Sequence, residues 1–545
     1  MMTMLFAALA GGALVLAGLP LTFALARRAL YAIVLAPLVS ALLATVAVMA
    51  MLVVGGSLRV WLAVVYALQA VLAVVLLRAR MAPVEHATTA DALWLTVPLL
   101  PPAATVIGPP TGWDAHSIWW LHAGYFTRGG EVTRQAMSEP GLAFSHPDYP
   151  PLPSAPVAAV WQVLGAADFH VARAVSALVT LSAIALLGFA VRRALGFAPP
   201  VAARLAGVLV ALAAWATEPA TVTAGYSDAL WAAAFVAGAL PLLLGQPARP
   251  VDVGLLAVAA LSKNEAFLAV VTLAMLLTVF RRAATGWWLP WLPVAAGGSW
   301  AALSRALGAT SDLQAGGRFR ELITVNPVVW DRLAPTVRAL WAVVGNVVTV
   351  AAVVALLGTL ALRGRRRRLG LASDGWLWGM VAGYTVPLIL AYLISPYDIN
   401  WHLRTSLDRV SLPLVLLACA SCAIWAGVAL DHMPGTSGAG AKADADTAHP
   451  VDSAGRTLSG HDPRMAPAQA PAMRTGRAPR KWPRSPAPGM TGSRTRSITT
   501  NRCRACTCPS VHGGAGRLKR CSGERPSSRP VSGSRTTSVR PWVTR

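Results

Sequence analysis

Asp114 is the first residue of the sequence whose type and surroundings suggest chemistry. It lies in the aromatic-rich stretch GPPTGWDAHSIWWLHAGYF, which directly follows an apolar run. A carboxylate can take a proton from a hydroxyl group, so Asp114 is our candidate for a general base. The alternative is an aromatic belt at a membrane surface, formed by Trp113, Trp119 and Trp120, in which Asp114 is merely solvated. Residue types alone do not separate these two interpretations.

A second polar segment follows in the same region, with the sequence FSHPDYPPLPSAP. It contains His146, Asp148 and Tyr149 among prolines, whose fixed φ restricts the backbone. Such a preorganised corner could contact a sugar or help to place an acceptor. A rigid turn before the next helix explains the same residues equally well.

Lys263 and Glu265 belong to the sequence SKNE, which interrupts two short apolar runs. Lys263 is the only lysine among the first 441 residues, which contain 26 arginines. A lone lysine indicates a site that needs a compact ammonium group, and a phosphate in a tight pocket is one ligand of that kind. The alternative is a lysine that reaches the membrane interface and pairs with Glu265.

The last polar segment of the apolar region, SPYDINWHLRTSLDRVSLP, contains His402, Arg404 and Arg409. Arg404 and Asp408 are four residues apart, which predicts an ion pair on an interfacial helix, worth about 0.3 kcal/mol. The functional interpretation is that Arg404 or Arg409 binds an anionic headgroup. Lysine and arginine are usually concentrated in cytoplasmic loops, so arginines on the outer side of a membrane indicate a specific role, such as binding an anion.

The elements that position these residues are predicted to be transmembrane helices, because 55% of the residues are apolar, only 13% are charged and the mean hydropathy is +0.55. Eleven runs approach the ~20 residues that a span needs. They cover residues 3–25, 31–54, 59–77, 92–108, 171–190, 202–217, 227–244, 285–303, 337–361, 375–394 and 411–430. The first run lacks a basic leader and should remain as an anchor. With a hairpin of two short helices around SKNE, the sequence predicts an all-α polytopic membrane protein of about 11–13 transmembrane helices.

The side on which each loop lies follows from the short basic loops, which are expected in the cytoplasm. These clusters are Arg27 and Arg28, Arg78 and Arg80, Arg192 and Arg193, Arg281 and Arg282, and Arg363 to Arg368. Alternating spans then put the amino terminus outside and the carboxyl-terminal tail inside. The loops 109–170, 304–336 and 395–410, together with the SKNE tip, are expected on the extracytoplasmic face of the inner membrane.

The sequence divides into amino-terminal helices over residues 1–80, a membrane core over 92–430 and a tail over 433–545. Residues 442–545 contain 20 lysines and arginines against 5 acidic residues, and they are rich in proline and serine. This composition predicts a disordered basic tail, or else a GC-rich gene read out of frame. The tail lacks interleaved aromatic residues and helical periodicity, so we expect no nucleic-acid partner.

Four motifs in order, WDAHSIWWLHA, HPDYPPLP, LSKNEA and WHLRTSLDR, resemble bacterial members of the GT-C superfamily of glycosyltransferases. More distant relatives are the protein O-mannosyltransferases and the lipid A aminoarabinose transferases. The resemblance covers about residues 92–430. It implies a helical membrane bundle whose large first extracytoplasmic loop is 109–170. It also implies a polyprenyl-phosphate sugar donor and a hydroxyl acceptor on a glycan, a lipid or a protein.

The resemblance implies roles for two of the candidate residues. An acidic residue near the start of the first loop serves such enzymes as the base, and that residue matches Asp114. The lysine of the short hairpin binds phosphate and matches Lys263, although relatives often read TKGP where this chain has SKNE. A direct displacement of phosphate would invert the anomeric centre. Isolated loop carboxylates define no metal site, so a divalent cofactor stays open.

Two other kinds of protein fit the same sequence. In a transporter or a flippase for lipid-linked sugars, Lys263 and Glu265 would line a translocation path. The sequence shows no inverted halves, and its long ordered outer loop is unlike a substrate gate. A catalytically inactive membrane scaffold is the third possibility, and it leaves the presence of Asp114 and Lys263 unexplained.

Overall fold

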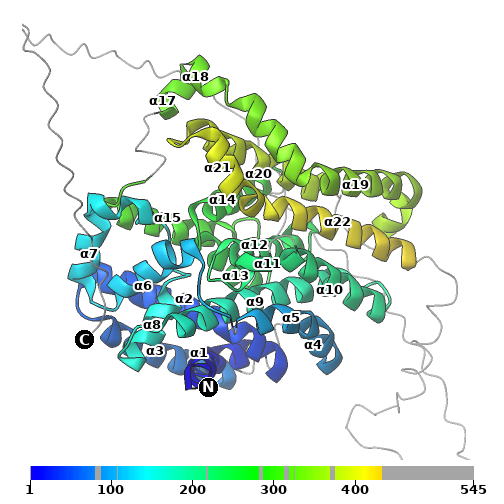
Figure 1. Cartoon of the computed structure of the whole chain (residues 1–545). Helices are drawn as coiled ribbons and strands as arrows, with labels where there is room; N and C mark the ends of the chain where they lie inside the picture. The colour runs from blue at the N-terminus through cyan, green and yellow to red at the C-terminus, as the bar shows by residue number, and fades with distance from the viewer. Residues whose placement is uncertain are drawn as a thin grey trace, which may run out of the picture. The chain divides into compact units, whose positions relative to one another are not determined.

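The computed structural model describes residues 2–26, 28–79, 88–106, 108–216, 219–280, 286–311, 318–324, 326–368 and 375–431. All of them belong to one unit, Met1–Thr457. Every regular element in these ranges is a helix (Figure 1), which confirms the predicted all-α class. The predicted tail, 433–545, lies outside the described residues.

Three long apolar helices open the chain and match the first three predicted spans. They are α1 (Met2–Ala26), α2 (Ala29–Val54) and α3 (Leu58–Arg78). At about 1.5 Å per residue, even the 21 residues of α3 approach the ~30 Å thickness of a bilayer's hydrocarbon core. The three helices pack against one another, and α1 and α2 also pack against α9 (Phe169–Ala194).

The predicted span 92–108 is wrong as a single helix. The structure divides it into α4 (Thr89–Thr96), a 3-10 turn η1 (Val97–Leu99) and α5 (Leu100–Thr105). Pro98, Pro101 and Pro102 lie at these junctions. Each proline lacks an N–H donor and its ring clashes with the preceding turn, so the run cannot continue as one α-helix.

The first predicted loop, 109–170, contains several short helices rather than irregular chain alone. These are η2 (Ala115–Trp119), α6 (Trp120–Phe126), α7 (Gly130–Ser138), η3 (Pro140–Ser145) and α8 (Ala155–Leu164). The proline-rich corner between η3 and α8 remains non-helical. Leu152 N–H in this corner donates to the carbonyl of Leu261, which fixes the first loop to the SKNE hairpin at an N···O distance of 3.1 Å.

The centre of the unit is built around α9, which packs against α10 (Pro200–Ala216) and α12 (Asp228–Leu243). Most side chains of α9 and all those of α12 are buried. A single turn, α11 (Pro219–Val222), precedes α12. The predicted spans 202–217 and 227–244 therefore form helices of 17 and 16 residues, which are short for crossing a ~30 Å core.

The SKNE segment forms the predicted hairpin of two short helices. They are α13 (Pro250–Ala260) and α14 (Asn264–Phe280), with a tight turn between them, and they pack against each other. The predicted span 285–303 appears as α15 (Trp291–Ala306), which has only 16 residues. Two short helices follow, α17 (Arg318–Ile323) and α18 (Pro327–Trp330).

Four helices complete the described part of the chain: α19 (Leu333–Arg368), α20 (Gly375–Ile394), α21 (Ile399–Val410) and α22 (Leu412–Leu430). Only Ser411 separates α21 from α22. The helix α22 packs against α19 and α20, and also against α10 and α12 of the centre. This contact brings α21 next to the start of α12, which it also touches.

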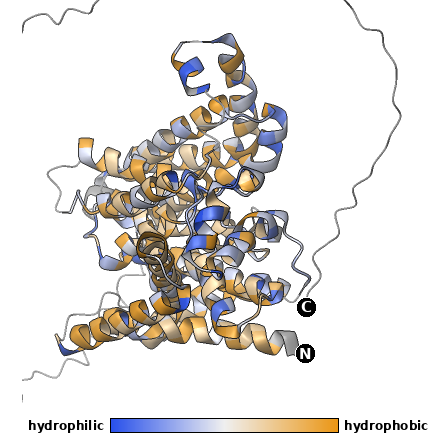
Figure 2. Cartoon of the chain, turned by 90° about the vertical axis from the view of Figure 1, so that its left-hand side faces the viewer, coloured by the Kyte–Doolittle hydropathy of each residue, from blue (hydrophilic) through white to orange (hydrophobic). Residues whose placement is uncertain are grey.

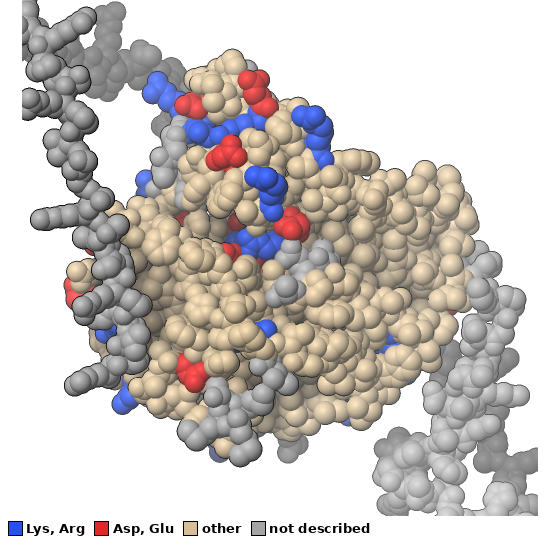
Figure 3. All heavy atoms as spheres, viewed as in Figure 1, with Lys and Arg blue, Asp and Glu red and all other residues tan. Residues whose placement is uncertain are grey.

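Seven helical segments are long and apolar enough to cross a membrane. They contain seven of the eleven predicted spans: those in α1, α2, α3, α9, α19, α20 and the continuous pair α21 and α22. Hydrophobic residues run along most helices in Figure 2. In Figure 3, charged residues gather at the end of the unit where α17, α18 and α21 lie. By length and composition, the described helices are thus those of a multi-pass membrane protein.

Candidate functional site

Asp114 lies at the start of η2, a π-helical turn, and its position is fixed by close backbone contacts. A Cβ atom on Gly112 would lie 2.8 Å from the Ala224 carbonyl oxygen, and one on Gly225 would lie 2.7 Å from the Trp120 ring. Gly225 also has a φ of +95°, which L side chains rarely adopt. Glycine at these two positions lets the Asp114 segment lie directly on the residues before α12.

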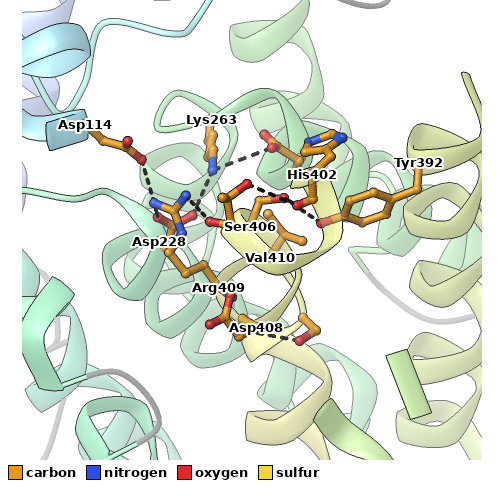
Figure 4. A network of polar contacts seen from close by, with 12 residues as sticks. Asp114, Asp228, Lys263, Tyr392, His402, Ser406, Asp408, Arg409 and Val410 are labelled. Carbon is orange, nitrogen blue, oxygen red and sulfur yellow. Dashed lines mark hydrogen bonds and ion pairs between the residues drawn. The ribbon is translucent and has the colours of Figure 1, made fainter. Parts of the chain in front are cut away.

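Arg409 of α21 meets the carboxylate of Asp114. Arg409 Nη1 donates to Asp114 Oδ2 over 2.5 Å, and the same nitrogen lies 3.5 Å from Asp228 Oδ2. Its Nη2 donates to the carbonyl of Thr405 one turn earlier, and the guanidinium lies over the ring of Tyr226. Figure 4 shows Asp114 and Asp228 approaching this guanidinium from different helices.

Asp228 is the central acid of the site, and no pattern in the sequence singled it out. It lies in the first turn of α12, its side chain is only 5% exposed, and Lys263 Nζ donates to Asp228 Oδ1 over 2.8 Å. Lys263 Nζ is also 3.5 Å from Glu265 Oε1. The five residues Asp114, Arg409, Asp228, Lys263 and Glu265 therefore alternate in charge along one connected series, which we call the charge network (Figure 4).

The electrostatic state of Lys263 follows from its two carboxylate neighbours. Burial acts to lower the pKa of Lys263, but Asp228 and Glu265 outweigh burial and raise this pKa above its ordinary value. The ammonium group therefore keeps its proton at neutral pH. Because its charge is already balanced by carboxylates, a phosphate would have to compete with Asp228 and Glu265 for Lys263.

A pocket of about 90 Å³ lies beside the Glu265 end of the charge network. Its polar lining comes from Asp148, Tyr149, Asn264, Glu265, Ser311, Ser395, Tyr397 and His402. Asn264 Nδ2 donates to Asp148 Oδ2 over 2.7 Å. Glu265 Oε2 is buried and has no hydrogen-bond partner among the described residues, so it is an acceptor to which a ligand hydroxyl could donate.

The proline-rich corner presents an aromatic stack to this pocket. The Tyr149 ring stacks between His146, at 4.7 Å between ring centroids, and Trp119, at 5.6 Å. His146 has a φ of +52° and is the only non-glycine residue with positive φ among those described. Strained backbone of this kind is found where the surrounding structure fixes a functional position. Of these three aromatic residues, only Tyr149 lines the pocket.

The last candidate segment divides between the pocket and the surface. His402 lines the pocket, and its Nδ1 is 2.8 Å from Ser395 Oγ. The predicted ion pair between Arg404 and Asp408 is wrong for the described structure. Asp408 Oδ1 instead accepts from the Arg409 backbone N–H, and the exposed Arg404 donates to the Asn400 carbonyl on the preceding turn.

Two further arginines, which the sequence did not single out, meet at Ser395, a residue that lines the pocket, although neither arginine lines the pocket itself. Arg318 and Arg332 both donate to the Ser395 carbonyl, the latter over 2.7 Å. Neither pairs with a carboxylate within 4 Å among the residues that the structure describes. Both come from the predicted outer loop 304–336, whereas arginines are usually concentrated in cytoplasmic loops. Their unusual position on the predicted outer side is the one signal in the sequence that could have identified them.

Asp114 and Lys263 thus belong to one charge network, but they do not touch each other and neither lines the pocket. Arg409 and Asp228 connect them. Asp228 is hard to find from sequence, because it is one acidic residue at the start of an apolar run, and nothing in its spacing pairs it with Lys263. Within the described ranges, no group of three His, Cys, Asp or Glu side chains is arranged to hold a metal ion.

The chain was compared with protein-family models, with the sequences of curated proteins and with solved structures. None of the three comparisons found a match.

Proposed function

We propose that this chain is a membrane glycosyltransferase of the GT-C type. It moves a sugar from a polyprenyl-phosphate donor to a hydroxyl acceptor at the extracytoplasmic face, with inversion at the anomeric carbon. One observation carries the proposal. A first-loop carboxylate and the hairpin lysine belong to a single charge network that ends at a pocket lined with hydroxyl-binding groups.

Asp114 acts as the general base in this proposal. The acceptor hydroxyl attacks the anomeric carbon, and its proton passes to the Asp114 carboxylate. Because Asp114 does not line the pocket, this step requires the acceptor to bind between the pocket and Asp114. The ion pair with Arg409 orients this carboxylate. The transition state of glycosyl transfer has oxocarbenium character, so the acceptor hydroxyl gives up its proton as the new bond forms.

The leaving group is the polyprenyl phosphate, which takes the electron pair of the broken bond to the anomeric carbon. Cations that lack a carboxylate partner are best suited to receive this charge. Lys263 and Arg409 already form ion pairs with carboxylates. Among the described residues, Arg318 and Arg332 donate to carbonyl oxygens, and the carboxylates of Asp398 and Glu321 act on Arg332 only from beyond 4 Å. We therefore assign contact with the phosphate to Arg318 and Arg332, and assign to Lys263 the role of holding Asp228 and Glu265.

The sugar occupies the pocket in this proposal. Its hydroxyl groups donate to Glu265 Oε2 and to Asp148, and the edge of the Tyr149 ring, whose faces are covered by His146 and Trp119, contacts the sugar. His402, held by Ser395, provides a further polar contact. Hydrogen-bond acceptors beside an aromatic ring satisfy both the polar edge and the apolar face of a pyranose.

Buried charges between membrane helices are also typical of transport proteins, so a flippase for lipid-linked sugars is the second candidate. The buried Lys263 ammonium between two acids favours this alternative. In reconstituted vesicles, a flippase would move a labelled lipid-linked sugar across the bilayer without attaching the sugar to an acceptor. A transferase would attach the sugar without moving the donor.

The proposal is tested in a strain that lacks the gene. We expect one glycan or glycolipid to lose a sugar and the corresponding polyprenyl-phosphate sugar to accumulate on the extracytoplasmic face. The intact gene and the control variant Glu131→Gln, which alters an exposed first-loop acid, should restore the product, whereas Asp114→Asn should not. Accumulation of the donor on the cytoplasmic face instead would contradict a transferase and indicate a flippase.

A further inference from the structure

A second cavity lies among the amino-terminal helices, and none of the five charge-network residues lines it. It is a groove of about 670 Å³ between α1, α3 and the end of α8. One face of α1 forms its floor, with residues spaced three and four apart: Phe6, Leu9, Ala10, Ala13, Leu14 and Ala17. The small alanines leave the space that larger side chains would fill.

The depth of the groove matches one leaflet of a bilayer. From Phe6 to Ala17, α1 advances about 16 Å at ~1.5 Å per residue, which is roughly half of the ~30 Å hydrocarbon core. At the Ala17 end, Gln69 of α3 donates to the Ala17 carbonyl over 2.8 Å and ties the two helices together. The groove therefore accepts a chain from one membrane surface and ends near the midplane.

Arg59 stands at the opposite end of the groove. It lies in the first turn of α3, and Leu62, Ala63 and Tyr66 continue the lining along the same face of that helix. Arg59 is exposed, donates to the Gln162 carbonyl of α8 over 3.3 Å, and has no carboxylate within 4 Å among the described residues. One uncompensated cation at the mouth of an apolar groove is complementary to an anionic group on an acyl chain.

We propose that this groove binds an anionic glycerophospholipid, with one acyl chain along α1 and the headgroup phosphate on Arg59. An acyl chain reaches the midplane and no further, which is the depth of the groove. A polyprenyl chain would extend beyond Ala17, the last residue of α1 that lines the groove. Because Arg59 also contacts α8, which follows the corner that holds Asp148, the bound lipid stabilises the packing of α8.

The test uses the full chain in nanodiscs of phosphatidylcholine that contain a small fraction of photoactivatable phosphatidylglycerol. We expect cross-links on residues 5–17 and 58–66, and several-fold weaker labelling by the matched phosphatidylcholine probe. Arg59→Gln should abolish this preference for the anionic probe, and Ala13→Trp, which fills the groove, should reduce labelling by both probes. Arg78→Gln is the control, because it removes an exposed arginine at the other end of α3.

The proposal would be overturned if both probes labelled the protein equally and Arg59→Gln did not change that labelling. The groove would then be ordinary lipid-facing surface. Competition by polyprenyl phosphate at lower concentration than phosphatidylglycerol would also overturn it, because the occupant would then be a different lipid. The assay measures no sugar transfer, so either result leaves the proposed function untouched. A failed transfer assay would likewise leave this lipid site intact.

Discussion

At the scale of single residues, Asp228 holds the site together. Its carboxylate faces Lys263 on one side and Arg409 on the other, in surroundings that leave it almost fully buried. Two cations that converge on one buried acid are stable only while that acid is ionised. Asp228 is a positioning residue, since it reaches the proposed chemistry only through Arg409 and Lys263.

The variant Asp228→Asn should leave both cations without their shared counter-charge. Breaking a buried ion pair from one side typically costs about 3–5 kcal/mol, so we expect a clear fall in the unfolding temperature of the purified protein. The double variant Asp228→Asn with Lys263→Gln removes one stranded cation and should recover part of the loss. Unfolding of the single variant at the wild-type temperature would show that the charge network adds nothing to stability.

His122 provides a pH-dependent prediction. Burial is the main reason that its pKa falls from the ordinary 6.5 to about 3, and its Nε2 bonds the Ser145 carbonyl over 2.9 Å. The unfolded chain therefore binds a proton before the folded protein does. The contribution of His122 to stability is complete above about pH 6.5 and is lost as the pH falls toward 3.

We expect His122→Gln, which keeps an N–H donor near the Nε2 position, to flatten the loss of thermal stability between pH 6.5 and 4.5. His170→Gln serves as the control, because His170 is exposed. Unfolding temperatures measured across this pH range test the prediction. Parallel pH curves for His122→Gln and the unmodified chain would contradict it.

The sequence identified several of these residues by contrast with their surroundings. A lone lysine, a carboxylate among tryptophans and arginines on the outer side are visible without coordinates, and Asp114, Lys263 and Arg409 all enter the charge network. Asp228 could not be found in this way, because its importance depends on contacts between α12, α21 and the hairpin. Contacts between helices distant in sequence leave no periodic pattern in either helix.

At the scale of elements, the π-helical turn that carries Asp114 depends on the close approach of its backbone to the residues that precede α12. Gly225→Ala would place a Cβ atom 2.7 Å from Trp120 and force a side chain into a φ of +95°. We expect a loss of about 1–3 kcal/mol in stability and reduced sugar transfer, because η2 must move away from Arg409.

The matched control for this prediction is Gly254→Ala in α13, where an added Cβ atom meets nothing within 4 Å. This substitution should be neutral or stabilise the protein by up to about 1 kcal/mol, since alanine favours a helix interior. Thermal unfolding of both variants, with transfer measured in parallel, makes the comparison. Equal behaviour of Gly225→Ala and Gly254→Ala would contradict the role assigned to close packing beneath Asp114.

Apolar runs predicted the helices well where they were long and free of proline. The run 92–108 failed because Pro98, Pro101 and Pro102 interrupt it. The runs 202–217 and 227–244 gave helices of 17 and 16 residues, which are short of a full span because the runs themselves cover only 16 and 18 residues. Hydropathy measures composition, and it does not show where backbone hydrogen bonding stops.

At the scale of the whole molecule, the proposed function requires the charge network to lie on the extracytoplasmic side of the membrane. Basic loops predict that the first loop faces outward and that the run Arg363 to Arg368 faces the cytoplasm. With the six native cysteines replaced by serine, Glu131→Cys should react with an impermeant maleimide in intact cells. Gly364→Cys should react only after the membrane is opened, and the reverse pattern would contradict the predicted orientation.

The most direct test of the central claim is the rate of sugar transfer in proteoliposomes, using the lipid-linked sugar that accumulates in the deletion strain. Asp114→Asn should lower this rate by about 10²–10⁴-fold, the usual contribution of a general base, while the donor still binds. Glu131→Gln should transfer at the wild-type rate. If Asp114→Asn also transferred at the wild-type rate, Asp114 would not be the base.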